Sequence, residues 1–338
     1  MKRFIHTLLV TALATGALAQ PTYPTIGTVV RNDPRLDRLL PKDARIDVLA
    51  SGYEWLEGPV WVKDGGYLLF SDVPQNTIFK WTARDGVTSF LKPSGYTGLP
   101  PYSKEPGSNG LAIDGAGRLI ACEHGDRRVT AMPLSGGGGK VTLADGYNGS
   151  RFNSPNDVAV HSNGSYYVTD PPYGLPKGEN DPARAPVFGV YRIDPDRRVT
   201  LVVRDLTRPN GVALAPGRDG TPEKTLYVAQ SDPQKPVIMA YDVQPDGSLG
   251  NGRLFFDASA LQKQGLKGLP DGLKVDREGN VWATGPGGVL VISPQGQLLG
   301  RIDPGEATAN CAWGDDGATL YLTADMYLCR IRTTARGW

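Results

Sequence analysis

A short pattern of alternating hydrophobic and polar residues recurs along this chain, and it is clearest from Leu269 to Thr284. This stretch, LPDGLKVDREGNVWAT, begins with an acidic residue and a glycine, and it continues with a run in which Leu273 and Val275 are hydrophobic. A charged turn that ends at Gly279 leads to a second hydrophobic run. Alternation with a period of two on both sides of a tight turn predicts two strands joined as a hairpin.

The same pattern begins at five other positions, which are Glu57, Asn109, Asn156, Asn210 and Asn310. Taken with Asp271, these starting positions lie 52, 47, 54, 61 and 39 residues apart in chain order. Repeats of this length indicate the blades of a β-propeller or of another solenoid. Helical repeats are excluded because every copy alternates with a period of two and carries glycine in its middle. We therefore expect an all-β fold, a six-bladed β-propeller with four-stranded blades.

The N-terminal part of the repeat region predicts how the ring closes. The last repeat supplies only three predicted strands, at 311–313, 319–323 and 328–332. The segment Arg45–Ala50 alternates as a strand does, so we expect Ile46–Leu49 to complete the last blade. Closing the ring with an N-terminal strand would remove exposed sheet edges.

The first residues predict export from the cytoplasm. Lys2 and Arg3 precede an apolar stretch from Leu8 to Leu18, and small residues occupy positions 17 and 19. This pattern is typical of a signal peptide that is cleaved after Ala19. A membrane anchor is the alternative, but the apolar stretch is shorter than the roughly 20 residues that a spanning helix needs. We expect a periplasmic or secreted protein.

Three units follow along the chain: a signal peptide at 1–19, a lead-in segment at 20–44 and a single propeller domain at 45–338. The lead-in is rich in proline and charge, so we expect it to pack loosely. The three cysteines, Cys122, Cys311 and Cys329, allow at most one intramolecular disulfide, and buried free thiols are the favoured alternative.

Charge and composition limit the kind of partner. Lys and Arg number 36 against 35 Asp and Glu, which gives a formal net charge of +1. This balance provides no electrostatic reason to expect nucleic acid or an anionic membrane. The 43 glycines and 28 prolines suit a chain with many tight turns. We expect a small-molecule partner and a monomer or weak homo-oligomer.

All six repeats start with a side chain that carries an oxygen. The innermost strands of a propeller line its central channel, so equivalent positions converge on the axis. The alternative is that Asn and Asp simply favour the turns before strands. For the two carboxylates, the alternative is a site at the surface and an incorrect alignment of the repeats.

Oxygen ligands without thiolate or imidazole suit a hard divalent cation, Ca²⁺ above all, with Mg²⁺, Mn²⁺ and Zn²⁺ as other possibilities. The expected ligands are Glu57, Asn156, Asn210 and Asp271. Two carboxylates and two amides would balance the charge of the ion and leave positions open for a substrate oxygen.

Six short motifs carry a resemblance to a known family. They are EGPVW from Glu57, CEHGDRRV from Cys122, SPNDV from Ser154, PNGVAL from Pro209, PDGLKVD from Pro270 and NCAWG from Asn310. In this order, they resemble the regucalcin and gluconolactonase family, in particular its bacterial gluconolactonase branch. The resemblance extends from about Val48 to Arg332.

The resemblance implies an axial metal held by Glu57, Asn210 and Asp271, with Asn156 at or beside it. It also implies lactone hydrolysis with Asp271 as general acid or base, and it places Arg151 and Asn109 at the substrate. Elementary chemistry agrees, because a cation polarises a lactone carbonyl and a nearby carboxylate accepts a proton from water.

Other possibilities remain open at this stage. Asn156 is a candidate for binding substrate as well as metal, and His124 is either a structural residue or a further substrate contact. No GxSxG motif is present to suggest a serine hydrolase. The same site could hydrolyse phosphotriesters, or the cation could merely brace a propeller that binds a ligand without catalysis. A base beside an open coordination position would favour an enzyme.

Overall fold

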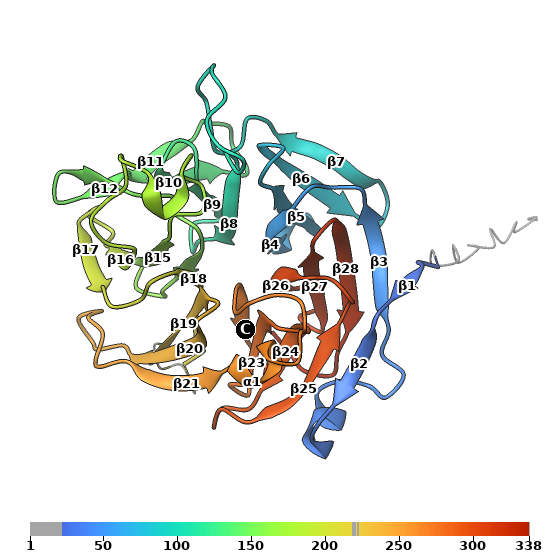
Figure 1. Ribbon diagram of the computed structural model, residues 1–338. Helices are drawn as coiled ribbons and strands as arrows, with labels where there is room; N and C mark the ends of the chain where they lie inside the picture. Colours follow the sequence, from blue (N-terminus) through green and yellow to red (C-terminus); the bar gives the residue numbers. More distant parts are fainter. Residues whose placement is uncertain (1–21, 218–220, 222, 338) are drawn as a thin grey trace, which may run out of the picture.

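Six β-sheets are arranged as blades around a central axis in this computed structural model, which describes residues 22–217, 221 and 223–337 (Figure 1). In four of the blades, four consecutive strands pair antiparallel in chain order. These strands are β4 (Leu56–Val62), β5 (Tyr67–Asp72), β6 (Thr77–Thr82) and β7 (Gly86–Leu91); β8 (Ser108–Ile113), β9 (Arg118–Glu123), β10 (Arg128–Pro133) and β11 (Val141–Ala144); β14 (Val158–Val160), β15 (Tyr166–Asp170), β16 (Gly189–Ile193) and β17 (Val199–Val203); and β18 (Pro209–Leu214), β19 (Thr225–Asp232), β20 (Lys235–Asp242) and β21 (Arg253–Asp257). The expected all-β, six-bladed propeller with four-stranded blades is confirmed.

The last two blades each take strands from the N-terminal part of the chain. The fifth blade consists of β22 (Leu273–Val275), β23 (Val281–Gly285), β24 (Gly288–Ile292) and β25 (Leu298–Asp303), with β2 (Thr28–Arg31) at its edge. The sixth consists of β26 (Thr308–Gly314), β27 (Thr319–Ala324) and β28 (Tyr327–Arg332), followed by β3 (Ile46–Ser51) and β1 (Thr25–Ile26). Figure 1 shows β3, in blue, beside β28, in red.

The segment before the propeller packs more tightly than its composition suggests. β2 pairs with β25 from Thr28 opposite Asp303 to Arg31 opposite Gly300. The short 3-10 helix η1 (Pro34–Arg38) follows, and Leu36 and Leu40 are both 0 % exposed in the core of the last two blades. The expectation of a loosely packed lead-in is therefore wrong for its described part, because hydrophobic residues between the prolines and charges are buried there.

Inner strands are irregular at the positions where the sequence repeats begin. The register shifts between Glu57 and Val60 in β4, and equivalent shifts occur in β8, β18 and β26. A β-bulge re-aims the side chain at the bulged position and increases the local twist. In each of these four strands the shift includes or adjoins the repeat position, so the side chains there depart from regular strand geometry.

Glycine follows several of these positions because neighbouring inner strands approach closely around the axis. A Cβ atom on Gly58 would collide with the carbonyl oxygen of Asn109, and one on Gly211 would collide with that of Asp271. Gly58 also has a φ of 50°, which favours glycine. The repeated glycine after Glu or Asn thus reflects the packing of one blade against the next.

The remaining elements are short and lie outside the four-strand units. They are the hairpin β12 (Gly146–Tyr147) and β13 (Ser150–Arg151), the 3-10 helices η2 (Lys63–Gly65) and η3 (Gly178–Asn180), and the helix α1 (Ser259–Gln262). Cys122, Cys311 and Cys329 are buried and free, which confirms the expectation of free thiols.

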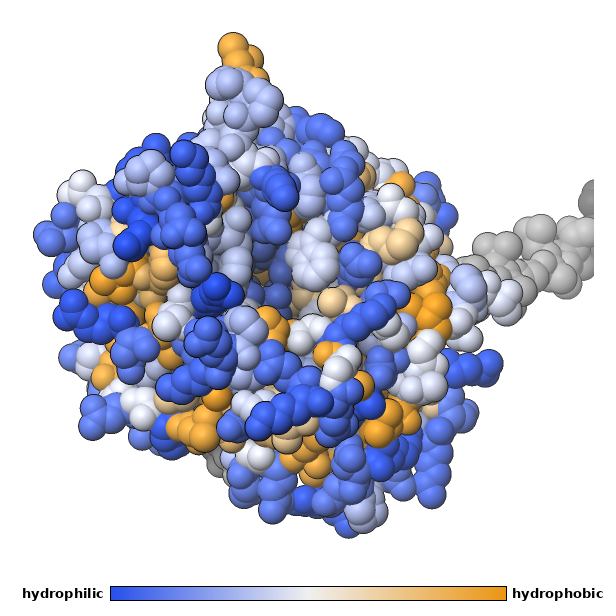
Figure 2. Space-filling model, in the orientation of Figure 1, coloured by the Kyte–Doolittle hydropathy of each residue, from blue (hydrophilic) through white to orange (hydrophobic). Residues whose placement is uncertain are grey.

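The outer surface gives little indication of an extended apolar interface on the visible side. Figure 2 shows one face of the ring, which is mainly hydrophilic, with hydrophobic residues in small separate groups. Within the part of the chain that the structure describes, no helix has both the length and the apolar character needed to cross a membrane.

Candidate active site at one end of the axis

A cavity of about 430 Å³ lies at the end of the axis where the inner strands begin. Five of the six repeat positions line it, one from each of five blades: Glu57, Asn109, Asn156, Asn210 and Asp271. Glu57, Asn109 and Asn156 are no more than 3 % exposed, although all three line the cavity. The structure therefore brings together all four predicted metal ligands, together with Asn109.

Two amide oxygens at this cavity are buried without a partner. The Oδ1 atoms of Asn109 and Asn210 accept no hydrogen bond from any residue that the structure describes. The orientation of Asn210 is fixed because its Nδ2 donates to Ser231 Oγ over 2.8 Å. A buried acceptor without a donor is costly, and a bound cation is one way to satisfy it.

Ser231 lies near the end of the second strand of its blade, β19, and two other blades have a hydroxyl side chain at the equivalent place. Each of these hydroxyl groups donates a hydrogen bond to the backbone of the following blade. Ser231 donates to the carbonyl oxygen of Pro270, and Thr169 donates to that of Asn210 over 2.6 Å. Ser71 donates to Asn109 O over 3.0 Å in the same way. These bonds fix the backbone at the site residues relative to the neighbouring blade.

The two carboxyl groups of the site line the same cavity, where Glu57 is buried and Asp271 is half-buried. Burial raises the pKa of both Glu57 and Asp271, and the charge of Glu57 raises the pKa of Asp271 further. Glu57 Oε2 accepts hydrogen bonds from Gly58 N over 3.0 Å and from Asn310 Nδ2 over 3.3 Å. Two carboxylates in one buried cavity repel each other unless a proton or a cation compensates their charge.

Asn310, the sixth repeat position, differs from the other five. It does not line the cavity, and it presents its amide nitrogen rather than its oxygen to Glu57. Its Oδ1 instead accepts from Cys311 N over 2.9 Å and lies 3.4 Å from Lys274 Nζ. The expectation that all six positions present an oxygen to one mouth is therefore wrong at Asn310, because two donors hold its oxygen elsewhere.

Neither Arg151 nor His124 lines the cavity that Asp271 lines. Arg151 lies in the hairpin strand β13, is exposed, and donates to the backbone oxygen of Asp126. His124 is 0 % exposed, and its Nδ1 lies 3.2 Å from the carbonyl oxygen of Glu105. Burial lowers the pKa of His124 to about 4, so it is neutral near pH 7.

Several residues that sequence reasoning did not select also line the cavity. Glu105 and Tyr173 come from the two long loops that precede Asn109 and follow β15. Burial raises the pKa of Glu105 to about 7. The Tyr173 hydroxyl has no hydrogen-bond partner among the described residues. The remaining lining residues are Trp55, Arg208, Ser231, Gly268 and Leu269. The length of these two loops was the only feature of the sequence that suggested a role at the site. Loop length does not indicate which residue of a loop reaches the axis.

A metal centre built mainly from histidine, cysteine and carboxylates finds no support. No group of three or more His, Cys, Asp or Glu side chains is placed to hold an ion within residues 22–217, 221 and 223–337. Any cation at this cavity would depend on amide oxygens in addition to Glu57 and Asp271, and the unpartnered Oδ1 of Asn210 fits that requirement.

Comparisons with known proteins show relatives that match over most of the chain. The family model described as SMP-30/Gluconolactonase/LRE-like region matches residues 55–325. The chain is 40 % identical to a gluconolactonase of Zymomonas mobilis over 98 % of this chain and 93 % of that protein. It is 27 % identical to a 6-deoxy-6-sulfogluconolactonase of Pseudomonas putida over 79 % of this chain and 82 % of that protein.

Solved structures extend this likeness to three dimensions. The structure of a gluconolactonase from Xanthomonas campestris matches with a TM-score of 0.77 and 30 % identity, covering 94 % of this chain and 99 % of that one. The family model spans most of the propeller, from the blade that carries Glu57 to the blade that carries Asn310. This chain therefore belongs to the SMP-30/gluconolactonase/LRE-like family.

Proposed function

We propose that this protein, which is a lactonase enzyme, hydrolyses sugar lactones of the aldonolactone class. The observation that carries the proposal is the convergence of Glu57, Asn109, Asn156, Asn210 and Asp271 on one axial cavity. Its volume of about 430 Å³ falls within the range of roughly 300 to 1,000 Å³ that is usual for small-molecule sites. The gluconolactonase that is 40 % identical over nearly the whole chain supports the same reaction.

We further propose that Glu57, Asn156, Asn210 and Asp271 hold one divalent cation. The donor set consists of oxygens, and it favours Ca²⁺, while Mg²⁺, Mn²⁺ and Zn²⁺ remain alternatives for the experiment. Support comes from the unpartnered Oδ1 of Asn210 and from the raised pKa values of the two carboxyl groups, which burial causes. Such a cation would polarise the lactone carbonyl and stabilise the charge that develops on its oxygen.

The side chains around the cation would transfer the proton and orient the substrate. Asp271 accepts a proton from the attacking water as general base and returns it to the leaving oxygen. Asn109 and Asn156 orient the lactone through their amides. A hydrolase that opens a lactone produces a hydroxy acid, so the reaction releases one proton near neutral pH.

We also infer that an N-terminal strand closes the ring and that the protein is exported. Closure is supported by the pairing of β3 with β28, from Ser51 opposite Tyr327 to Ile46 opposite Ile331. Export to the periplasm or the medium rests on the sequence at 1–19, which lies outside the described residues. A small-molecule lactone remains the proposed partner, with the protein a monomer or a weak homo-oligomer.

The proposal can be tested on the purified mature protein. Elemental analysis should find about one divalent metal ion per chain, and a pH-indicator assay should detect hydrolysis of glucono-1,5-lactone above the spontaneous rate. Treatment with EDTA should abolish the enzymatic rate, and CaCl₂ should restore it. The same assay with a phosphotriester tests the alternative reaction.

The outcomes separate the possible functions. Turnover of a phosphotriester but of no aldonolactone would replace the proposed substrate class. Tight metal binding without turnover of any lactone would support a propeller that only binds a ligand. Full lactonase activity after complete removal of metal would contradict the role of the cation while leaving the reaction itself in place.

A further inference from the structure

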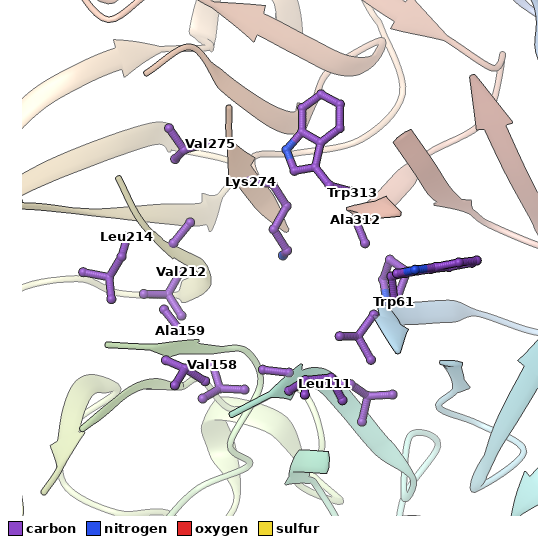
Figure 3. Close-up of a pocket in the computed structure, with 16 residues that line it drawn as sticks. Trp61, Leu111, Val158, Ala159, Val212, Leu214, Lys274, Val275, Ala312 and Trp313 are labelled. Carbon is purple, nitrogen blue, oxygen red and sulfur yellow. The ribbon is translucent and has the colours of Figure 1, made fainter. Parts of the chain in front are cut away.

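The opposite end of the channel is chemically different from the candidate active site. A second cavity of about 270 Å³ lies there, lined by residues farther along the same inner strands. Of the sixteen lining residues, Lys274 is the only one with a charged side chain, and the others are hydrophobic or proline. Figure 3 shows the Lys274 side chain extending into the space between Trp61, Leu111, Val212 and Ala312.

Lys274 points from this apolar end toward the residues beneath the active-site cavity. Its Nζ donates to Leu273 O over 3.0 Å and lies 3.4 Å from Asn310 Oδ1. Lys274 is partly exposed, and an ammonium group in mainly apolar surroundings needs nearby acceptors to compensate its lost hydration. One backbone acceptor and one side-chain acceptor therefore compensate the ammonium group at the edge of the apolar cavity.

Asp157, just before β14, carries a buried carboxyl group. Its carboxylate is buried and accepts from Val158 N over 2.9 Å and from Val212 N over 3.2 Å. These two bonds fix the Asp157 carboxyl group to two neighbouring inner strands.

Asn310 connects Lys274 to the active site. Because its Oδ1 faces both Lys274 Nζ and Cys311 N, its Nδ2 must point the other way, where it donates to Glu57 Oε2 over 3.3 Å. A rotation of the amide by half a turn would place its oxygen against the Glu57 carboxylate. That arrangement would be repulsive, and it would disturb the position of a proposed metal ligand.

We propose that Lys274 is a positioning residue for the metal site: from the opposite end of the channel, it fixes the Asn310 amide so that this amide holds Glu57 in place. The inference rests on the proposed function, because the position of Glu57 affects catalysis only when a cation binds there. Lys274 does not line the active-site cavity, so it acts through Asn310 rather than on the substrate.

The first test compares Ca²⁺ affinity among lysine variants by isothermal titration calorimetry with CaCl₂. Lys274→Met keeps an unbranched side chain that suits the apolar cavity but removes the ammonium. Its dissociation constant should rise by about tenfold, the lower end of the effect of losing a residue that orients a ligand. Lys274→Arg should restore most of the affinity because it keeps a charged donor.

A matched control removes a positive charge without touching the channel. Lys63 is exposed in η2, just after β4, at the same end of the propeller as the apolar cavity. Lys63→Met should bind Ca²⁺ as the wild type does. If Lys274 acted only by repelling the cation, Lys274→Met would bind Ca²⁺ more tightly than the wild type, which would overturn the proposal.

A double-mutant cycle tests the connection through Asn310. Lys274→Met should weaken Ca²⁺ binding in the wild type but change it by less than about twofold in an Asn310→Ala background, since residues that act in series are not additive. Equal effects in both backgrounds would contradict the route through Asn310. If the methionine variant does not fold, Lys274→Gln keeps an N–H donor without the charge and should show a smaller loss in the same cycle.

A metal-independent measurement separates this proposal from the proposed function. A crystal structure of Lys274→Met in EDTA should show the Asn310 amide moved out of hydrogen-bond distance of Glu57. An unchanged amide would overturn the positioning role. A wild-type protein that binds no divalent cation would instead overturn the proposed metal site, and the crystal structure of the variant would still decide whether Lys274 fixes Asn310.

Discussion

The side-chain amide of Asn310 donates to the carboxylate of Glu57 over 3.3 Å, although 253 positions separate the two residues in the sequence. The bond joins the inner strand of the first blade, β4, to that of the last, β26. The candidate site therefore depends on the contact between the two blades that meet where the ring is completed. Any residue that stabilises the last blade should also support the site.

The N-terminal segment provides the first prediction, which concerns stability. Leu36 is 0 % exposed and packs with Leu40 and with residues of the last two blades. Leu36→Ala should lower the free energy of unfolding by about 2 to 5 kcal/mol, the usual range for a leucine removed from a core. Urea denaturation of the mature protein measures this loss.

The matching control is Leu99→Ala, because Leu99 is 100 % exposed in the long loop before β8. This change should alter the free energy of unfolding by less than about 0.5 kcal/mol. A similarly small effect of Leu36→Ala would mean that the N-terminal segment contributes little to the core of the last blades.

The fold was largely predictable, because each blade repeats the same local signals. Alternation with a period of two marked the strands, and the glycine after Glu57 or Asn210 marked the point where inner strands meet. The pairing of β2 with β25 was not predictable. The four residues of β2, TVVR, do not indicate that the strand pairs with β25, which lies near the other end of the chain.

The residues of the candidate site were predictable where they occupy equivalent positions in the sequence repeats. Five positions with the same place in their blades meet at one cavity, as the alignment of repeats predicted. Glu105 comes from a loop without periodicity, so no alignment could place it. The amide orientation of Asn310 follows from contacts with Cys311 N and Lys274 Nζ, and those contacts exist only in three dimensions.

His124 provides a prediction about pH. Its pKa is lowered by burial from the usual 6.5 to about 4, so between these pH values the unfolded chain binds a proton that the folded protein does not. Stability should therefore fall as the pH is lowered from about 6.5 to about 4. Relative to His124→Gln, the wild type should lose about 1.4 kcal/mol of unfolding free energy per pH unit in this interval.

Urea denaturation in EDTA at several pH values between 4 and 7 measures this difference. The nearby carboxyl group of Glu105, whose Oε2 lies 3.9 Å from His124 Nδ1, is present in both proteins, so its own titration largely cancels. A difference that stays constant with pH would show that His124 becomes protonated equally easily in the folded and unfolded states.

Export leads to a prediction about the mature N-terminus. Cleavage after Ala19 should leave Gln20 as the first residue of the periplasmic or secreted protein, because small residues at positions 17 and 19 suit signal peptidase. N-terminal sequencing of that fraction measures it. A chain that lacks residues 2–19 should remain in the cytoplasm, and an exported protein that still begins at Met1 would contradict the prediction.

Asn210 tests the proposed metal site without removing the base. Asn210→Ala deletes an amide oxygen that has no hydrogen-bond partner among the described residues, so a cation should bind more weakly. Lactonase activity should fall at low CaCl₂ and recover in part at high CaCl₂. Asn251→Ala, at an exposed position, should behave as the wild type. A loss that no concentration of CaCl₂ reduces would argue against Asn210 as a ligand.

A substitution of Asp271 can separate the effect on metal binding from the effect on catalysis. Asp271→Asn keeps an oxygen at the proposed ligand position but cannot accept a proton from water. Some Ca²⁺ binding should survive, while kcat at saturating CaCl₂ should fall by roughly 10²- to 10⁴-fold, the usual contribution of a general acid or base. The activity of Asn210→Ala should recover with CaCl₂, whereas that of Asp271→Asn should not.

The comparison requires that both variants fold, which thermal melting in EDTA can establish before any kinetics. Burial and the charge of Glu57 raise the pKa of Asp271, so the metal-free protein favours the neutral form of its carboxyl group, which a neutral amide resembles. Asp271→Asn should therefore melt no lower than the wild type in EDTA. If the variant folds, binds Ca²⁺ and still hydrolyses lactones at a near-normal rate, Asp271 is not the base, and a cation that acts alone on the carbonyl becomes the better explanation.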